Sequence, residues 1–293
     1  MTATALARKA DLTGSAFMIL AMALFAVEDA FIKSAARSLP VGEVLMLFGL
    51  GGALVFGTLA RLRGLPLFVP DLLSRPMCIR AVFEVSGRLF YTLAIALIPL
   101  SAATVILQAT PLVVVAGAAV LFGEQVGWRR WAAILIGLLG VVIIIEPGTA
   151  GFSLLSLLAV AGMIGFAGRD LASRAAPPTV GTLRLGLTGF CAVIVAGLIV
   201  ALWDGQALTR PGGGAIFAVV WAVTAGVGAY ACLMKAMRTG DVSAVTPFRY
   251  SRLLFGVAIG VVVFGETLDT ATLSGAGLIV LSGLFIMWRG KPA

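Results

Sequence analysis

The sequence of 293 residues is 60% hydrophobic and only 12% charged, with a mean hydropathy of +1.10. A soluble domain is about half apolar and about a quarter charged, so water is not the main solvent of this chain. Because one helical membrane crossing takes about 20 apolar residues, the length accommodates about ten crossings and leaves too little chain for a separate soluble domain.

Ten apolar windows, separated by short segments rich in proline and glycine, predict ten transmembrane helices and an all-α integral membrane fold. The first window lacks a small-residue cleavage pattern, so we expect it to remain in the protein as the first span. In chain order the windows cover residues 14–36, 42–62, 77–97, 101–122, 129–145, 153–175, 180–202, 213–236, 242–264 and 271–288.

The net charge of +8 is explained by membrane orientation, because cytoplasmic loops carry an excess of lysine and arginine. If the N-terminus is cytoplasmic, the outer side receives only Lys33, Arg37 and Arg210. The bias persists to the last loop, which predicts an even number of spans, two cytoplasmic termini and no nucleic-acid partner. The residues assigned to the cytoplasmic side are Arg8, Lys9, Arg61, Arg63, Arg75, Arg80, Arg129, Arg130, Arg174, Lys235, Arg238, Arg289 and Lys291.

A repeated motif divides the sequence into two halves. Residues 99–104 (Pro-Leu-Ser-Ala-Ala-Thr) lead to Phe-Gly-Glu at 122–124, and residues 241–246 (Asp-Val-Ser-Ala-Val-Thr) lead to Phe-Gly-Glu at 264–266. Both pairs are 142 residues apart, counted from Pro99 to Asp241 and from Phe122 to Phe264. Close to the same offset, the first span matches the sixth through Phe25 and Phe166, Asp29 and Asp170, and Lys33 and Arg174.

Five spans in each half place the two halves in opposite orientations, which is a recurring arrangement in secondary transporters. We therefore predict two inverted five-helix repeats, residues 1–147 and 148–293, that form one membrane domain around a central cavity. Duplication in a membrane enzyme or scaffold is the alternative. Glu124 and Glu266 stand at symmetric helix ends, which predicts a structural role such as capping, with gating as the alternative.

These features resemble the drug/metabolite transporter superfamily, and within it the EamA-type branch, whose two copies each end in a Gly-Glu pair before the last helix. The resemblance implies a basket of ten helices, alternating access, and export of amino acids or related metabolites across a bacterial inner membrane. Within this branch the chain is similar to the YddG group of aromatic and neutral amino-acid exporters. The halves differ at the expected cavity wall, where residues 247–252 of the second copy replace residues 105–110 of the first.

Three side chains of the third span predict a stripe that binds substrate. Ionised groups inside a membrane are costly, so they usually face a cavity, a partner or the interface. Glu84 and Arg88 are four residues apart, which permits an ion pair on one helix face, and Tyr91 lies one turn further along. The stripe can bind the ammonium and carboxylate groups of a zwitterion. A structural ion pair between helices is the alternative.

The ninth span contributes Arg249 and Tyr250 just after Pro247. Proline kinks a helix and frees polar backbone, which membrane proteins tolerate mainly where it is buried or lines water. We expect the planar fork of Arg249 to contact a substrate carboxylate and Tyr250 to line the same wall. Arg249 and Arg252 both lie near the cytoplasmic end, so snorkelling to the interface is the alternative.

Gln108 and Tyr230 complete the predicted binding wall. Gln108 precedes Pro111 by three residues and therefore lies beside a second predicted kink. Its amide can bind substrate or, as the alternative, form an interhelical hydrogen bond worth about 0.6 kcal/mol. Tyr230 in the eighth span adds an aromatic surface, for which ordinary packing is the alternative.

Glu28 with Asp29, and Arg169 with Asp170, occupy matching depths in the first and sixth spans. Repeat-related positions converge near the midplane in transporters of this kind. We therefore predict a gating or coupling role for these four residues. The alternative is a set of salt bridges between the repeats that stabilises one conformation.

The sequence contains no histidine, Walker sequence, HExxH motif or nucleophile elbow. Its isolated cysteines, Cys78, Cys191 and Cys232, indicate neither a disulfide framework nor a metal site. We therefore predict no catalytic residue, metal or cofactor, and a protein that is not an enzyme. The sequence leaves the coupling mode open, and facilitated diffusion, proton antiport and metabolite exchange are all compatible with it.

The predicted function is secondary transport, with export of aromatic or neutral amino acids or related small metabolites by alternating access. One alternative is a carrier for anionic metabolites, because Arg88, Arg169, Arg249 and Arg252 can make the cavity positive. Another is an integral-membrane enzyme that acts on lipid-linked substrates. The expected partners are a small-molecule substrate and the lipid bilayer, and the sequence is compatible with a monomer.

Overall fold

The computed structural model describes residues 3–123, 125–146, 153–177, 179–239 and 245–288, where the regular structure is entirely helical. Glu124, the Arg174 side chain, residues 241–244 of the repeated motif and the predicted boundary between the halves lie outside this description. The helices are α1 (Ala3–Ala35), α2 (Val41–Leu62), η1 (Pro70–Leu73), α3 (Arg75–Leu97), α4 (Leu100–Leu107), α5 (Thr110–Phe122), α6 (Trp128–Ile145), α7 (Ser156–Arg174), α8 (Thr182–Asp204), α9 (Gly213–Thr239), η2 (Thr246–Tyr250), α11 (Ser251–Phe264) and α12 (Thr270–Trp288).

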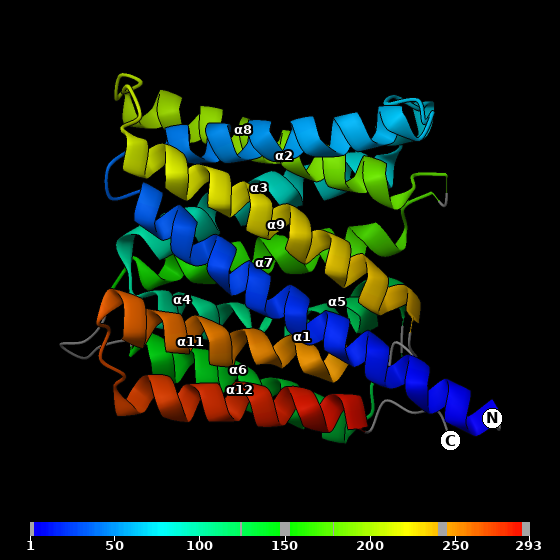
Figure 1. The fold of residues 1–293 in the computed structure, drawn as a ribbon. Helices are drawn as coiled ribbons and strands as arrows, with labels where there is room; N and C mark the ends of the chain where they lie inside the picture. Colours follow the sequence, from blue (N-terminus) through cyan, green and yellow to red (C-terminus); the bar gives the residue numbers. More distant parts are fainter. Residues whose placement is uncertain (1–2, 124, 147–152, 178, 240–244, 289–293) are drawn as a thin grey trace.

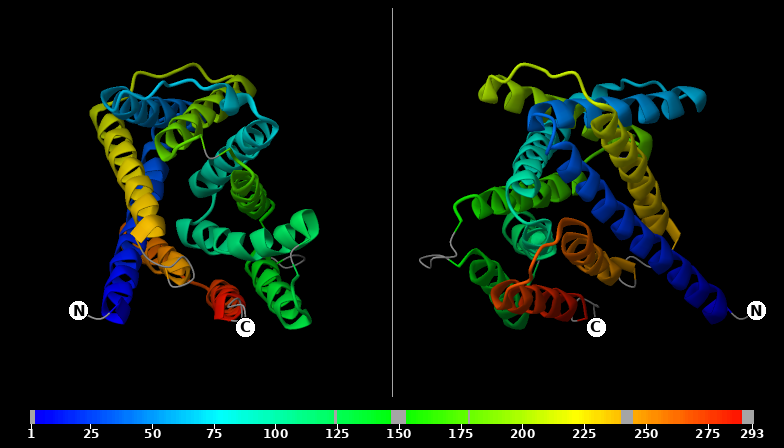
Figure 2. Two further views of the ribbon diagram at one scale, coloured as in Figure 1. Left: turned by 90° about the vertical axis from the view of Figure 1, so that its right-hand side faces the viewer. Right: turned by 60° about the vertical axis from the view of Figure 1, so that its left-hand side comes forward.

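The long helices lie side by side, and their closest pairings join the beginning of the chain to its end. α1 packs along α9, α2 along α8, α3 along α7 and α6 along α12. Figure 1 shows the α2–α8 pair at one edge of the molecule and the α6–α12 pair at the opposite edge. Both views of Figure 2 place α1 with α9 on one side and α3 with α7 on the other. Each pair therefore contains one helix from each predicted half.

In the described part of the chain, 8 helical stretches are long and apolar enough to cross a membrane, so the chain is a multi-pass membrane protein. They are Lys9–Ala35, Val41–Leu62, Leu100–Phe122, Trp128–Ile145, Thr182–Asp204, Gly213–Met237, Thr246–Phe264 and Thr270–Trp288. Two other helices, α3 with 23 residues and α7 with 19, have the length of a span. Both helices carry several charged residues, and most of these belong to the candidate site.

Helices are interrupted at corresponding places in the two halves, and a proline lies near each break. α4 ends at Leu107 and α5 begins at Thr110, with Pro111 in the first turn of α5. In the second half, the 3-10 segment η2 has Pro247 in its first turn and leads directly into α11. Proline lacks an amide donor and its ring clashes with the carbonyl four residues earlier. The regular α-helix is therefore interrupted near both prolines at which the sequence predicts kinks.

Glycines allow α3 and α7 to approach closely. A Cβ atom on Gly165 would lie 2.5 Å from the Cα of Gly87, and a Cβ on Gly162 would lie 2.8 Å from the amide nitrogen of Tyr91. Small residues at such crossings let helix backbones pack against each other in a membrane. The crossing of α3 and α7 fixes the relative position of the charged side chains that these helices carry.

Replacing Gly165 by valine is expected to lower the free energy of unfolding by about 1–3 kcal/mol, because the added methyl groups overlap the backbone of α3. Gly277→Val on α12 is the matched control, since a Cβ there meets nothing within 4 Å and the change in helix propensity is the same. Thermal unfolding in detergent measures both variants. Equal melting temperatures for the two variants would contradict the close contact.

Candidate functional site

Charged side chains from α1, α3, α7 and α11 meet inside the helix bundle in two groups. Four helices that are distant in sequence supply them, so the site depends on the packing of α1 and α7 against α3. The first group, called the α1 cluster, consists of Glu28, Asp29, Arg88, Tyr91 and Arg252. The second group, called the α7 cluster, consists of Arg80, Glu84, Arg169, Asp170 and Ser173.

In the α1 cluster, two adjacent carboxylates of α1 hold arginines from different helices. Nη1 of Arg88 lies 2.8 Å from Oε1 of Glu28, and Nη2 of Arg252 lies 2.6 Å from Oδ2 of Asp29. The Tyr91 hydroxyl donates to the same Asp29 oxygen at 3.1 Å. Both carboxylate side chains are only 1% exposed, so each depends on its arginine to offset the loss of hydration. Asp29 and Arg252 come from different predicted halves, so their ion pair joins the halves.

Aromatic rings surround the two arginines of the α1 cluster. The Arg88 guanidinium lies 5.6 Å from the ring centroid of Phe48 and 5.8 Å from that of Phe166. The Arg252 guanidinium lies 5.1 Å from the ring centroid of Phe25. Aromatic rings attract a cation at this range, and they exclude water at the same time. The arginines therefore sit between a charged partner and an apolar wall.

Four buried polar atoms of the α1 cluster make no hydrogen bond with the described residues. Oε2 of Glu28 and Oδ1 of Asp29 are buried and have no hydrogen-bond partner among the described residues. The same holds for Nε of Arg88 and Nε of Arg252. Buried polar groups are normally hydrogen-bonded, and an unmade bond costs about 1–3 kcal/mol. The cluster therefore offers two acceptors and two donors to a polar ligand.

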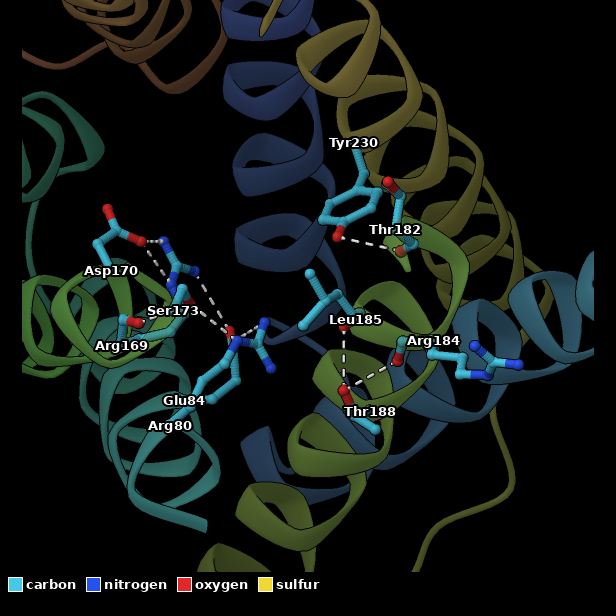
Figure 3. A network of polar contacts seen from close by, with 10 residues as sticks. All are labelled: Arg80, Glu84, Arg169, Asp170, Ser173, Thr182, Arg184, Leu185, Thr188 and Tyr230. Atoms are coloured by element: carbon cyan, nitrogen blue, oxygen red, sulfur yellow. Dashed lines mark hydrogen bonds and ion pairs between the residues drawn. The ribbon is translucent and has the colours of Figure 1, made fainter. Parts of the chain in front are cut away.

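In the α7 cluster, Glu84 lies between two arginines (Figure 3). Nη2 of Arg80 is 3.0 Å from Oε2 of Glu84, and Nη1 of Arg169 is 3.3 Å from Oε1. Arg169 also pairs with Asp170 at 2.8 Å, while Nε of Arg80 donates to the Ser173 hydroxyl at 3.0 Å. Arg169 and Asp170 are 25% and 27% exposed, more than the other ion-paired groups of the two clusters. The pair of Glu84 and Arg169 again joins the predicted halves.

Glu84 and Arg88, whose spacing permits an ion pair, do not pair with each other. Glu84 pairs with Arg80, one turn earlier in α3, and Arg88 pairs with Glu28 of α1. Both arginines stand four residues from Glu84, so only the packing of α3 against its neighbours decides between them. Arg80, which the sequence assigned to the cytoplasmic charges, is only 7% exposed inside α3. Its four-residue spacing from Glu84 is the sequence signal for its place in the site.

Gln108 and Arg249 meet where the two proline interruptions face each other. Nε2 of Gln108 donates to the backbone carbonyl of Arg249 at 3.2 Å, so the interhelical hydrogen bond considered for Gln108 is present. The Arg249 side chain is partly buried and has no ion-pair partner among the described residues. Arg252, three residues further along, enters the α1 cluster instead.

The tyrosines Tyr230 and Tyr250 lie apart from the charged clusters. Tyr250 is 6% exposed, and its hydroxyl packs against Gly283 of α12, while the wall predicted for it together with Arg249 stays a prediction. The Tyr230 hydroxyl donates to the Thr182 carbonyl at 3.4 Å, and its ring meets that of Phe56 edge to face at 5.3 Å. Figure 3 shows Tyr230 well separated from Glu84. Tyr91 is the predicted tyrosine that reaches the charges.

The two clusters are electrically balanced. Opposite charges attract strongly in an interior of low dielectric constant, and an excess of either sign there is costly. Four guanidinium groups face four carboxylates, so the formal charge of the paired groups is zero. These groups are Arg80, Arg88, Arg169 and Arg252 on one side and Glu28, Asp29, Glu84 and Asp170 on the other.

Both parts of the chain match the sequence profile of the EamA-like transporter family, over residues 12–146 and again over residues 151–288. The chain belongs to the EamA-like transporter family. This family lies within the drug/metabolite transporter superfamily, so the resemblance given by the repeated Phe-Gly-Glu motif is confirmed at that level. The narrower resemblance to the YddG group stays a prediction.

Relatives of this EamA-like chain are named as carriers of different small molecules. A riboflavin transporter of Vibrio cholerae is 33% identical over 208 residues, which cover 67% of this chain and 65% of the relative. An S-adenosylmethionine uptake transporter of Rickettsia felis is 26% identical and covers 75% of this chain and 74% of its own. The pseudopaline exporter CntI of Pseudomonas aeruginosa is 27% identical and covers 92% and 94%. The chain is thus similar to transporters of small metabolites.

A solved crystal structure of a protein has the same fold as this EamA-like chain. It superposes with a TM-score of 0.63 and covers 94% of this chain and 96% of its own. The two sequences are 23% identical, so the likeness concerns the fold alone.

Proposed function

We propose that this protein is a secondary carrier for amino acids, or for small metabolites with an amino-acid head group, that works by alternating access. Membership of the EamA-like transporter family supports transport of a small molecule. One relative is named for S-adenosylmethionine, a molecule that carries both an α-ammonium and an α-carboxylate group. The observation that carries the proposal is the balanced set of buried charges that the two halves supply together.

The proposed architecture has ten spans in two inverted repeats, residues 1–147 and 148–293. The double match to the family profile supports this division. The helix packing supports it as well. If each helix is replaced by its counterpart in the other half, the α1–α9 pair becomes the α7–α3 pair, and the α2–α8 and α6–α12 pairs stay the same. The helix breaks before Thr110 and before Ser251, which are 141 residues apart, agree with it, since interrupted helices in matching positions mark binding sites in transporters.

A zwitterion fits the balanced clusters better than an anion does. The carboxylate of the zwitterion can pair with an arginine of the site in place of a protein carboxylate. Its ammonium group can pair with a carboxylate of the site in place of an arginine. The net charge of the site then stays the same. An anion would leave one negative charge uncompensated in a low-dielectric interior. The free polar atoms of Glu28, Asp29, Arg88 and Arg252 would complete the contacts. Tyr91 hydrogen-bonds to this group, and Phe25, Phe48 and Phe166 would face an aromatic or apolar side chain.

The remaining predicted residues take supporting roles in this proposal. Arg169 and Asp170 would meet the substrate on its way to the α1 cluster, because they are the more exposed charges. Arg249, whose guanidinium has no ion-pair partner among the described residues and whose backbone carbonyl bonds to Gln108, would attract the substrate carboxylate near the proposed cytoplasmic end. One chain supplies every helix of the site, so a monomer suffices. Asp29–Arg252 and Glu84–Arg169 would break and reform as the halves move.

Orientation follows from the distribution of basic residues along the helices. Lys9, Arg61, Arg63, Arg75 and Lys235 all lie at the end of the molecule where α1 begins and α12 ends, on the right in Figure 1. This excess supports a cytoplasmic location for that end and for both termini, and we propose that the carrier lies in the inner membrane of a bacterial cell. We propose export as the working direction, although a secondary carrier follows its gradients and relatives are named for both uptake and export.

Counterflow in proteoliposomes tests the proposed function. Vesicles that contain the purified protein are loaded with one unlabelled compound, and entry of labelled phenylalanine or threonine is followed over time. A panel of neutral amino acids should support saturable counterflow, whereas anionic metabolites should not. Vesicles without protein are the control. Counterflow driven only by anions, or by no member of the panel, would overturn the proposal.

A further inference from the structure

A second polar group joins the two halves at the end of the molecule where α1 ends and α4 begins. This end, called the distal end, is opposite the start of α1 and lies on the left in Figure 1. It contains Lys33 near the end of α1, Ile98 just after α3, Leu100 at the start of α4, and Glu266 two residues after α11. None of these residues belongs to the α1 or α7 cluster.

Glu266 caps a helix of the other half. Its Oε1 accepts a hydrogen bond from the Leu100 amide at 2.6 Å, and its Oε2 accepts from the Ser101 amide at 2.9 Å and the Ser101 hydroxyl at 2.8 Å. The first amides of a helix lack intrahelical partners and carry partial positive charge, so a carboxylate there is stabilising. The capping role predicted for this glutamate is present, and it acts between the halves rather than within one helix.

The Phe-Gly-Glu motif explains how the Glu266 carboxylate reaches α4. Gly265 ends α11 with a φ of +67°, a left-handed conformation that suits glycine and turns the chain back. The Glu266 amide then bonds to the carbonyl of Gly260 at 3.0 Å. A Cβ atom on Gly260 would collide with Oε2 of Glu266, so this glycine leaves the space that the carboxylate fills. The motif thus positions the Glu266 carboxylate at the N-terminus of α4.

Lys33 makes the complementary contact with the helix before α4. Its Nζ donates to the carbonyls of Ile95 at 2.8 Å and Ile98 at 2.6 Å, which end α3. A cation at a helix C-terminus and an anion at a helix N-terminus are both favoured by the helix dipoles. Nζ of Lys33 also lies 3.9 Å from Oε1 of Glu266, and both side chains are nearly buried, with 12% and 9% exposure. The turn between α3 and α4 is therefore held from both sides by opposite charges.

We propose that the contact of Glu266 with Leu100, Ser101 and Lys33 is the gate that closes the distal end of the carrier. The inference rests on the proposed alternating-access function, and it assigns a role to residues outside the substrate site. Glu266 belongs to the second half, and its partners belong to the first. Rocking of the halves that opens this end must break these contacts.

The gate lies about one helical turn from the proposed substrate site. Lys33 is one helical turn from Asp29, and Ser101 is one turn from Thr104, which is 0% exposed. Thr104 packs against Gly256 of α11, so separation of α4 from α11 would expose it. A chemical reporter at Thr104 therefore senses whether the distal end is open, without any need for a substrate.

The experiment places Thr104→Cys in a chain whose three natural cysteines are replaced by serine. The full-length protein in proteoliposomes is treated with a membrane-impermeant thiol reagent, added to each side in turn. Glu266→Gln is expected to raise the labelling rate about tenfold or more from the distal side only, because its amide group presents donors to the amides of α4. Lys33→Met should act in the same direction. An unchanged rate in both variants would overturn the gate.

Two controls separate opening of the gate from other effects. Glu43→Gln removes another carboxylate contact between the halves, since Oε2 of Glu43 accepts from the amide and hydroxyl of Thr209, each at 3.0 Å. Glu43 ties α2 to the loop after α8, away from α4, so labelling of Thr104→Cys should stay unchanged. A Ser282→Cys reporter, buried at the α6–α12 contact, should stay unreactive in Glu266→Gln unless the fold is lost. Labelling of both reporters, or labelling from both sides, would contradict a gate.

The labelling result does not depend on which molecule is carried. If amino-acid counterflow fails but Glu266→Gln opens Thr104→Cys to the reagent, the gate stands and the proposed substrate is wrong. If counterflow succeeds and labelling does not change, the carrier stands and the gate is wrong.

Discussion

Replacing Arg252 by alanine is expected to lower the initial rate of amino-acid counterflow by about 100-fold or more. Arg252 supplies the guanidinium of the Asp29 ion pair that joins the halves, with a separation of 2.6 Å. Removing one partner of a buried pair costs about 3–5 kcal/mol because the other charge is left alone, and every 1.4 kcal/mol is a factor of ten. Asp29 would then hold a proton or a cation in place of the arginine, and the substrate carboxylate would lose its partner.

Two comparisons show whether the loss in Arg252→Ala reflects transport or folding. The double variant Asp29→Asn with Arg252→Met removes both charges, so it should recover normal thermal stability while counterflow stays absent. Arg249→Ala removes an arginine that has no ion pair among the described residues and should lower counterflow only about tenfold. Near-normal counterflow in Arg252→Ala, at wild-type protein levels, would remove the Asp29–Arg252 pair from the mechanism.

Glu84→Gln is expected to be strongly destabilising. Glu84 is only 4% exposed and is the carboxylate that holds both Arg80 and Arg169. Neutralising it leaves two guanidinium groups in the interior with one fewer counter-charge, and we expect a loss of about 3–5 kcal/mol in the free energy of unfolding. The melting temperature of the purified protein in detergent measures the effect.

Asp170→Asn is the matched control for Glu84→Gln. Asp170 also pairs with Arg169, but its side chain is 27% exposed and Arg169 keeps Glu84 as a partner. Water screens part of this charge, so the loss should be about 1 kcal/mol. A larger loss of stability in Asp170→Asn than in Glu84→Gln would show that Glu84 does not hold the α7 cluster together.

The positions of the helices were largely predictable because hydropathy alone identifies the segments that span a membrane. The window at residues 42–62 coincides with α2 almost to the residue, and the window at 77–97 was found despite its charges. The first helix begins at Ala3, well before the predicted residue 14. Residues 3–13 include Arg8, Lys9 and Asp11, and these charges made the predicted apolar window begin later than the helix. Hydropathy identifies the segment that crosses the membrane, whereas the helix itself can extend beyond that segment.

Membership of the site was also largely predictable, but the pairing within it was not. Charges inside a membrane are few because they are costly, so scanning for them found Glu28, Asp29, Glu84, Arg88 and Asp170. Their partners depend on the crossings of α1, α3 and α7, which local spacing does not encode. Arg80 and Arg88 are equally distant from Glu84 along the helix, and only α1 supplies the carboxylate that takes Arg88 away.

The choice between Arg249 and Arg252 shows a further limit of sequence reasoning. Residues 246–250 form a 3-10 helix after Pro247, and α11 begins at Ser251. A 3-10 helix has about 3.0 residues per turn rather than 3.6, so the faces of the two segments do not line up. A continuous α-helix drawn through the sequence therefore assigns the wrong direction to the side chains. Tyr250 consequently packs on α12, while Arg252 reaches Asp29.

The most direct test of the central claim compares three compounds that share one side chain. Vesicles containing the wild-type protein are loaded with phenylalanine, with phenethylamine, which lacks the carboxylate, or with N-acetylphenylalanine, which lacks the ammonium group. Entry of labelled phenylalanine is then measured. A site with balanced charges predicts rapid counterflow with phenylalanine alone. Equal counterflow with N-acetylphenylalanine would show that the site selects anions, and counterflow with none of the three would contradict an amino-acid carrier.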